Sequence, residues 1–435
     1  MIKFLLSFFL ILILLSKKIF FFGIETEYAT SFLGILDIIS IIAMLIGGTY
    51  FFCKDYLKQK SLSVKDKPRF KKFDIGILVM LVGITTIIGM SYRINVNKTS
   101  VHWDAIALYD ARARFLNSGI KFSEMPKLSD NDDKNSYYYL LYPPYTSIGH
   151  YFWQNSVGTK DIPVSVYYTI FLGILTLVIT FFTKKHLGLR LSLFLALLTI
   201  SNISVFKVSI KEYTNLPYTL HIVGGTFLLY LFLKNNKTWE LMMGTLLISS
   251  SIWIRFLEPV WLVVAISLFL STLIKKQELS KKILSFILII SFSSIQYFSW
   301  TYFAQTIGGN AGFLDISYVS LIEPLLGVLT GSWFPVLAVF IGSWGIPIFV
   351  YLFTLAAVYV RKVDMRKDPG LLFLSLIIVF SICMYYSQLY FVSFQTEWWE
   401  AAAKSLDRSS TFLVPIAGFI LLEFLKLRGY SRKHS

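Results

Sequence analysis

Charged side chains are scarce in this sequence. Only 15% of the 435 residues are Asp, Glu, Lys or Arg, and 55% are hydrophobic. A soluble globular domain carries about 25% charged residues, so this composition excludes an ordinary water-soluble fold. The apolar residues form continuous runs, and a helix needs about 20 of them to cross a bilayer. Because the runs do not alternate apolar with polar residues, they favour transmembrane helices over a transmembrane β-barrel.

Residues that build metal or disulfide sites are also few. The chain has two cysteines, Cys53 and Cys383, and five scattered histidines. No spacing is typical of a zinc site or a disulfide framework, and neither a phosphate-binding glycine loop nor a His-Glu-x-x-His motif occurs. The sequence therefore predicts no resident cofactor. A divalent metal is left open, but no residue pattern supports one.

Basic residues exceed acidic ones, giving a formal net charge of +16. Lys and Arg gather in short segments between the apolar runs, with eight in 54–72 and four each in 275–282, 361–367 and 426–435. This pattern is typical of cytoplasmic loops beside anionic lipid and argues against a nucleic-acid partner. We expect a multi-pass protein of the plasma membrane with both termini in the cytoplasm.

The apolar runs predict an all-α bundle of about twelve transmembrane helices in a single domain, 1–435. We expect Lys17 and Lys18 to snorkel or to end the first helix early, and Pro347 to kink the tenth. The first helix is expected to be retained rather than cleaved as a signal peptide. The expected spans are 3–22, 29–53, 73–92, 163–183, 187–205, 216–233, 239–254, 259–274, 283–304, 333–360, 369–390 and 409–426.

One long extracytoplasmic loop, 93–162, concentrates polar and aromatic residues. Trp103, Ala107, Asp110 and Arg114 follow helical spacing, which predicts a short helix at the membrane surface. Asp104 directly follows Trp103 and is either an N-cap of this helix or a general base. Asp110 is either the partner of Arg114 in an i,i+4 ion pair or a second candidate base.

Other polar residues follow or precede apolar runs on the same expected side. Tyr142 precedes two prolines that fix an extended segment, and its ring suits either sugar stacking or an interfacial belt. Cations on this side could cradle a lipid phosphate, or each could form a salt bridge with a neighbour. The candidate substrate-binding residues are His102, Trp103, Arg112, Arg114, Tyr142, Lys211, Glu212, Arg255, Glu258, Asp407 and Arg408, with Lys207 as a further cation of the cradle.

Several of these segments resemble the GT-C glycosyltransferases, in particular polytopic members akin to the family 39 mannosyltransferases. Trp103-Asp104-Ala105 and Tyr109-Asp110-Ala111-Arg112-Ala113-Arg114-Phe115 resemble their first outer loop. Tyr142-Pro143-Pro144, Arg255 to Glu258, and Ser405-Leu406-Asp407-Arg408 with Pro415 are similar to later motifs, in the same order. The resemblance covers about 101–415.

The resemblance implies a GT-C-like fold and an inverting sugar transfer from a polyprenyl-phosphate donor. The acceptor would be a hydroxyl of a glycan, lipid or protein, and the base would be Asp104, with Asp110 as second candidate. Two alternatives remain. One is a transporter or flippase of lipid-linked or small substrates, which should show repeated halves and charges at the bilayer midplane. The other is a polysaccharide polymerase. No internal repeat is evident in the sequence.

Overall fold

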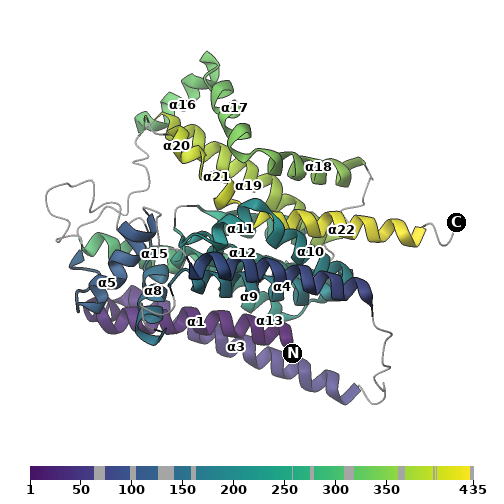
Figure 1. The fold of residues 1–435 in the computed structure, drawn as a ribbon, viewed down its shortest axis with the longest axis horizontal. Coiled ribbons are helices and arrows are strands. Elements are labelled where there is room, and N and C mark those ends of the chain that lie inside the picture. The colour runs from purple at the N-terminus through teal and green to yellow at the C-terminus, as the bar shows by residue number, and fades with distance from the viewer. Residues whose placement is uncertain are drawn as a thin grey trace.

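The computed structural model describes residues 1–62, 74–97, 104–125, 142–157, 163–256, 258–274, 279–307, 318–360, 368–394, 397 and 399–431. Every regular element in these ranges is a helix. The long helices form one bundle, in which most of them run side by side (Figure 1). They are α1 (Ile2–Ile24), α3 (Phe32–Leu62), α4 (Ile75–Val96), α9 (Val166–Leu187), α10 (Leu189–Ser201), α12 (Asn215–Asn235), α13 (Thr238–Ser250), α14 (Val260–Ile274), α15 (Leu279–Thr306), α17 (Trp333–Trp344), α18 (Ile346–Val360), α19 (Pro369–Ser393) and α22 (Leu413–Ser431).

Shorter helices connect the long ones. They are α2 (Thr26–Ala29), the π-helix η1 (Asp104–Asp110), α5 (Ala111–Asn117), α8 (Tyr145–Val157), α11 (Ile203–Ser209), the 3-10 helix η2 (Ser251–Trp253), α16 (Tyr318–Thr330), α20 (Trp399–Ala403) and α21 (Leu406–Ser409). Seven of the described helices are long and apolar enough to cross a bilayer, or ten if each of three bent pairs is one span. The chain thus has the all-helical architecture of a multi-pass membrane protein, and the expected count of twelve spans remains a prediction.

Helix α12 forms the centre of the bundle. Residues 215–233 of this helix are all buried, and it packs against α13, α9 and α19. The polar side chains of this helix, such as Thr219 and His221, are thereby kept away from lipid. Small residues bring α12 and α13 close together, since a Cβ added at Gly225 would lie 2.7 Å from the Ile248 side chain and 3.0 Å from the Gly244 carbonyl. Close packing through small residues is a common way for membrane helices to associate.

Lys17 and Lys18 correct one sequence expectation, because neither snorkels and neither ends α1. Their side chains are 2% and 0% exposed, and the helix continues unbroken to Ile24. Lys18 Nζ lies 2.5 Å from an Asp37 oxygen on α3, and that carboxylate also accepts hydrogen bonds from Gln296 and Ser299 of α15. A partner at the same depth keeps the Lys18 charge inside the protein, which the sequence pattern could not reveal.

The tenth expected span is also corrected, because it is broken rather than kinked at Pro347. Helix α17 ends at Trp344, and Gly345 follows with φ of 61°, a conformation that favours glycine. Helix α18 then begins at Ile346, which places Pro347 in its first turn. A proline there costs little, because its missing N–H would have no helical partner.

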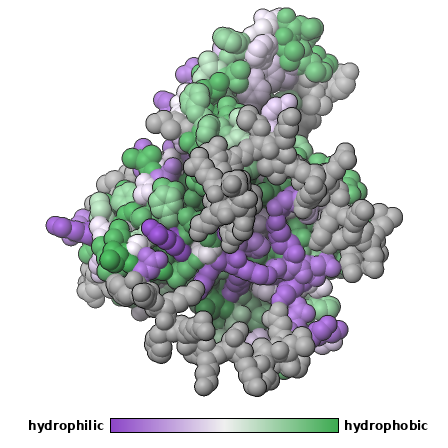
Figure 2. All heavy atoms as spheres, turned by 90° about the vertical axis from the view of Figure 1, so that its right-hand side faces the viewer, coloured by the Kyte–Doolittle hydropathy of each residue, from purple (hydrophilic) through white to green (hydrophobic). Residues whose placement is uncertain are grey.

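The start of α1 and the end of α22 lie at one end of the bundle (Figure 1). Lys426 donates a hydrogen bond to the His186 carbonyl, and Lys234 pairs with Asp368 at 2.5 Å. The first contact joins α22 to the end of α9, and the second joins the end of α12 to the start of α19. Figure 2 shows hydrophilic residues gathered on this face. We refer to it as the basic end, and its assignment to the cytoplasm remains a prediction.

Candidate functional site

The candidate site lies at the opposite end of the bundle from the chain termini. Helices α5 and α8 lie there (Figure 1), and they pack on each other and on η1. The segment before α12 reaches the same end, since Tyr213 packs with Tyr109 of η1. The segments after η2 and before α22 join it there, since Arg255 donates hydrogen bonds to Thr214 and Ser409. Alternating helices therefore gather segments that are far apart in the sequence.

Part of the loop 93–162 is helical, from Asp104 to Asn117, as its residue spacing predicted. Helix η1 begins at Asp104 and continues directly into α5 at Ala111. His102 and Trp103 lie outside the described residues, as does the side chain of Asp104. The base and the N-cap interpretations of Asp104 therefore both stay predictions.

Asp110 forms the ion pair that its spacing indicated. Its Oδ2 accepts hydrogen bonds from Arg114 Nε at 2.9 Å and Nη2 at 2.6 Å, and its Oδ1 accepts one from Gln154 at 2.6 Å. Gln154 belongs to α8, so the carboxylate also joins η1 to α8. Both carboxylate oxygens are engaged, which makes Asp110 a weaker candidate for a base than its position alone suggested.

Arg112 connects the same helix to the segment before α8. Its side chain is buried, and Nη1 donates a 2.8 Å hydrogen bond to the Tyr142 carbonyl. The guanidinium lies over the Phe122 ring at 5.1 Å, a geometry in which cation and ring attract. Arg112 therefore holds Tyr142 in place.

Three tyrosines from separate segments form what we call the tyrosine cluster: Tyr109, Tyr142 and Tyr213. They pack together with Leu108, and the rings of Tyr109 and Tyr142 meet edge to face at 6.0 Å. Two cations border this cluster. The Arg408 guanidinium lies 4.8 Å from the Tyr213 ring centre, and Lys211 Nζ lies 5.8 Å from it. The structure thus brings Lys211 and Arg408 to the same ring.

Arg255 lies beside the cluster in a buried ion pair. Its Nε and Nη2 donate to the two oxygens of Glu258, each at 2.5 Å, and Nη2 also donates to Ser409 at 3.0 Å. Burial alone would lower the pKa of Arg255, but the Glu258 carboxylate and the nearby Tyr142 hydroxyl raise it well above its ordinary value. The side chain stays charged, and the salt-bridge alternative is confirmed for this residue.

The remaining acidic candidates have different surroundings. Asp407 accepts a long hydrogen bond of 3.4 Å from Ser204 of α11. Glu212 is only 1% exposed. The Arg408 backbone carbonyl accepts a hydrogen bond from Asn215 at 3.3 Å, which fixes the segment before α22 against the start of α12. Lys207 lies in the last turn of α11.

Sequence reasoning missed Tyr213 and His150. Tyr213 carries no motif of its own, although its place between Lys211 and the start of α12 was a usable signal. His150 of α8 lies 2.9 Å from the Tyr168 hydroxyl and 6.2 Å from the Tyr109 ring. Burial, with the charge of Lys17 as a smaller contribution, lowers the pKa of His150 to about 3. The imidazole is therefore neutral at physiological pH.

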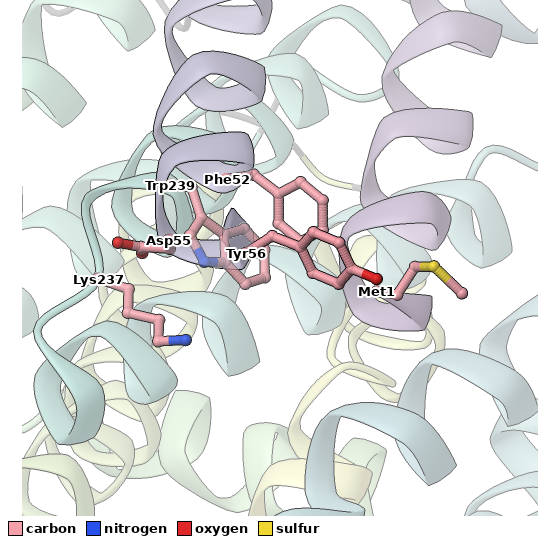
Figure 3. A pocket seen from close by; sticks show the side chains of 6 residues that line it. All are labelled: Met1, Phe52, Asp55, Tyr56, Lys237 and Trp239. Atoms are coloured by element: carbon pink, nitrogen blue, oxygen red, sulfur yellow. The ribbon is translucent and has the colours of Figure 1, made fainter. Parts of the chain in front are cut away.

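Two further features of the part of the chain that the structure describes bear on this site. No three His, Cys, Asp or Glu side chains are placed to hold a metal there. A small pocket of about 70 Å³ lies at the basic end (Figure 3) and contains none of the predicted site residues. It is lined by Met1, Phe52, Asp55, Tyr56, Lys237 and Trp239.

No protein-family model, curated protein or solved structure matches this chain.

Proposed function

We propose that this protein is a GT-C-like membrane glycosyltransferase. It moves a sugar from a polyprenyl-phosphate donor to an acceptor hydroxyl on the extracytoplasmic face, with inversion at the anomeric carbon. The observation that carries this function is the meeting of Lys211 and Arg408 at the ring of Tyr213. Cations beside aromatic rings suit a ligand that has a phosphate joined to a sugar.

The reaction assigns a part to each group. The acceptor oxygen attacks the anomeric carbon while its proton passes to a carboxylate, for which Asp104 is the first candidate and Asp110 the second. The bond from the anomeric carbon to the phosphate oxygen breaks, and the polyprenyl phosphate leaves with the electron pair. Arg408 and Lys211 stabilise the charge that develops on this leaving group.

Arg255 has a different part in this mechanism. Its donors are directed at Glu258, Ser409 and Thr214, so it positions the segments of Arg408 and Tyr213 rather than binding phosphate itself. Tyr142 supplies a ring face for the sugar, and the buried ring of Tyr109 packs against it. The chain's own residues account for these roles without a cofactor, and a divalent metal on the phosphate stays open.

The same cation cluster would serve a polymerase of lipid-linked oligosaccharides, which differs only in the size of the transferred unit. A transporter is the second class, and the buried Lys18–Asp37 pair is the observation in its favour. Lys18 precedes the end of α1 by six residues, or roughly 9 Å at 1.5 Å per residue. In a hydrocarbon core about 30 Å thick, this depth lies between the membrane surface and the midplane where transporters bind substrate.

The decisive experiment incubates the purified protein in nanodiscs with a panel of polyprenyl-phosphate sugars and acceptors, and measures released polyprenyl phosphate. Arg408→Ala should weaken donor binding about tenfold to a hundredfold, since a hydrogen bond to a charged group contributes about 1.5–3 kcal/mol. Arg408→Lys should restore it only in part, because the planar fork is lost.

Lys404→Ala is the matched control, because Lys404 is an exposed cation of the same segment. It should leave donor affinity unchanged. The protein would be a transporter and not a transferase if no donor released polyprenyl phosphate and proteoliposomes took up a lipid-linked or small substrate.

A further inference from the structure

Lys17 is a buried cation for which the sites above give no role. It lies within α1, is 2% exposed, and forms no ion pair with any carboxylate of the described residues. Its ammonium instead donates to the Tyr145 carbonyl at 3.1 Å and to the Tyr167 hydroxyl at 2.8 Å. A charged group so deep in a membrane helix is costly and is rarely without a purpose.

The surroundings of Lys17 form a cage suited to an ammonium. Its Nζ lies 3.4 Å from the centre of the Tyr145 ring and 5.3 Å from that of Tyr167. Ring faces and two oxygens compensate for lost water, and desolvated cation–π contacts are the strong ones. Gly149 admits the lysine, since a Cβ at that position would lie 2.8 Å from Nζ.

The two consecutive lysines of α1 contact different parts of the fold. Lys18 pairs with Asp37 and Gln296 within the membrane bundle. Lys17 contacts the first residue of α8, which is an element of the outer face. Tyr145 also follows Tyr142 by only two prolines, and the ring of Tyr142 belongs to the tyrosine cluster. The position of α8 therefore sets the position of a candidate sugar contact.

We propose that Lys17 is a positioning residue that fastens α8 to the membrane bundle and so holds Tyr142 in the candidate site. Other contacts between α1 and α8 are apolar, such as the stacking of Phe20 on Tyr151 at 4.8 Å. Apolar contacts of this kind allow α8 to slide along α1. The hydrogen bond and the cation–π contact of Lys17 are directional, so they hold Tyr145 of α8 in one position. Only the effect on catalysis rests on the proposed function.

The test measures how often α8 opens. Ser147 of α8 is fully buried, so Ser147→Cys should react with a small thiol reagent only when α8 leaves the bundle. The exposed Cys53 and Cys383 are first replaced by serine. Lys17→Met keeps the length of the side chain and removes its charge. It should raise the labelling rate of Ser147→Cys by about tenfold to a hundredfold, from one charged hydrogen bond and one cation–π contact.

A second buried cysteine separates local opening from general loosening. Ser267→Cys lies in α14 and is likewise 0% exposed, and its labelling should not change in Lys17→Met. An equal rise at both cysteines would make Lys17 a residue of general stability and overturn the proposal. An unchanged rate at Ser147→Cys would also overturn it.

Conservative changes at the tyrosines test the cage itself and remain useful if Lys17→Met folds poorly. Tyr145→Phe retains the ring and the carbonyl, so labelling of Ser147→Cys should stay near that of the parent. Tyr145→Leu removes the ring, and Tyr167→Phe removes one acceptor, so both should increase labelling. Equal rates in Tyr145→Phe and Tyr145→Leu would contradict the cation–π contact and with it the proposal.

The effect of Lys17→Met on catalysis is measured separately, from the kinetics with the donor. With fewer molecules in the docked state, Lys17→Met should raise the KM for the donor more than it lowers kcat, because apparent affinity falls with the competent fraction. If the wild-type protein releases no polyprenyl phosphate but Lys17→Met still opens α8, the proposed function fails and the positioning role of Lys17 stands.

Discussion

The buried ion pair between Lys18 and Asp37 gives a quantitative test of the fold. The Asp37 oxygens lie 2.7 and 2.5 Å from Lys18 Nζ and accept further hydrogen bonds from Gln296 at 2.5 Å and Ser299 at 2.7 Å. Both charged side chains are at most 1% exposed. Removing one partner leaves a charge in the interior, which typically costs about 3–5 kcal/mol. Lys18→Met and Asp37→Leu should each lower the free energy of unfolding by about this amount.

The double variant should be much more stable than either single variant, because it leaves no buried charge. Gln296 and Ser299 lose a partner, so a residual cost of about 1–2 kcal/mol is expected. The coupling energy of the double-mutant cycle should therefore exceed about 3 kcal/mol. The assay is reversible unfolding of the purified protein in mixed micelles, with the exposed Lys54→Met as a control that should change little. Additive losses in the double variant, or single losses below about 1 kcal/mol, would refute the ion pair.

Further predictions concern the outer face. Asp104→Asn should lower turnover by about 10²–10⁴-fold if Asp104 is the base, with normal donor binding, whereas retained turnover would leave it a helix cap. Asp110→Asn should lower turnover less, since Asp110 accepts hydrogen bonds from Arg114 and Gln154. A larger loss of turnover in Asp110→Asn than in Asp104→Asn would make Asp110 the base. Because the pKa of His150 is about 3 in the folded protein and about 6.5 when unfolded, the unfolded chain binds more protons below pH 6.5. The free energy of unfolding should therefore fall as the pH drops from 6.5 towards 3, by roughly 2 kcal/mol at pH 5. His150→Asn should abolish this pH dependence. For topology, an impermeant thiol reagent should label from outside a cysteine placed near Asp132 and not one near Lys65, both of which lie outside the described residues. The reverse pattern would invert the orientation.

Much of the fold was predictable because lipid imposes simple rules. The expected span 216–233 is α12, within two residues at each end, since a long apolar run has few alternatives in a bilayer. The pair of Asp110 and Arg114 was also predictable, because four residues place two side chains on one face of a helix.

Features that depend on which helices pack together were not predictable. The sequence gives no sign that α3 places Asp37 beside Lys18, or that α8 places Tyr145 over Lys17. Tyr213 is one tyrosine among 25, and only the meeting of three segments distinguishes it. Gly345 rather than Pro347 breaks the tenth span, because a positive φ needs a glycine whereas a first-turn proline is compatible with a helix.

The enclosed position of α12 has a consequence for how the chain is made. It is the least hydrophobic of the seven candidate spans and at the same time the only one whose apolar window is completely buried among the described residues. Thr219, His221 and Thr226 lie on it, and such residues disfavour transfer of an isolated helix from the translocon into lipid. Helix α12 should therefore remain at the translocon until α13 has been synthesised, and the two should enter the bilayer together. A nascent chain that stops before residue 238 should leave α12 incompletely inserted, whereas one that extends past residue 254 should insert it.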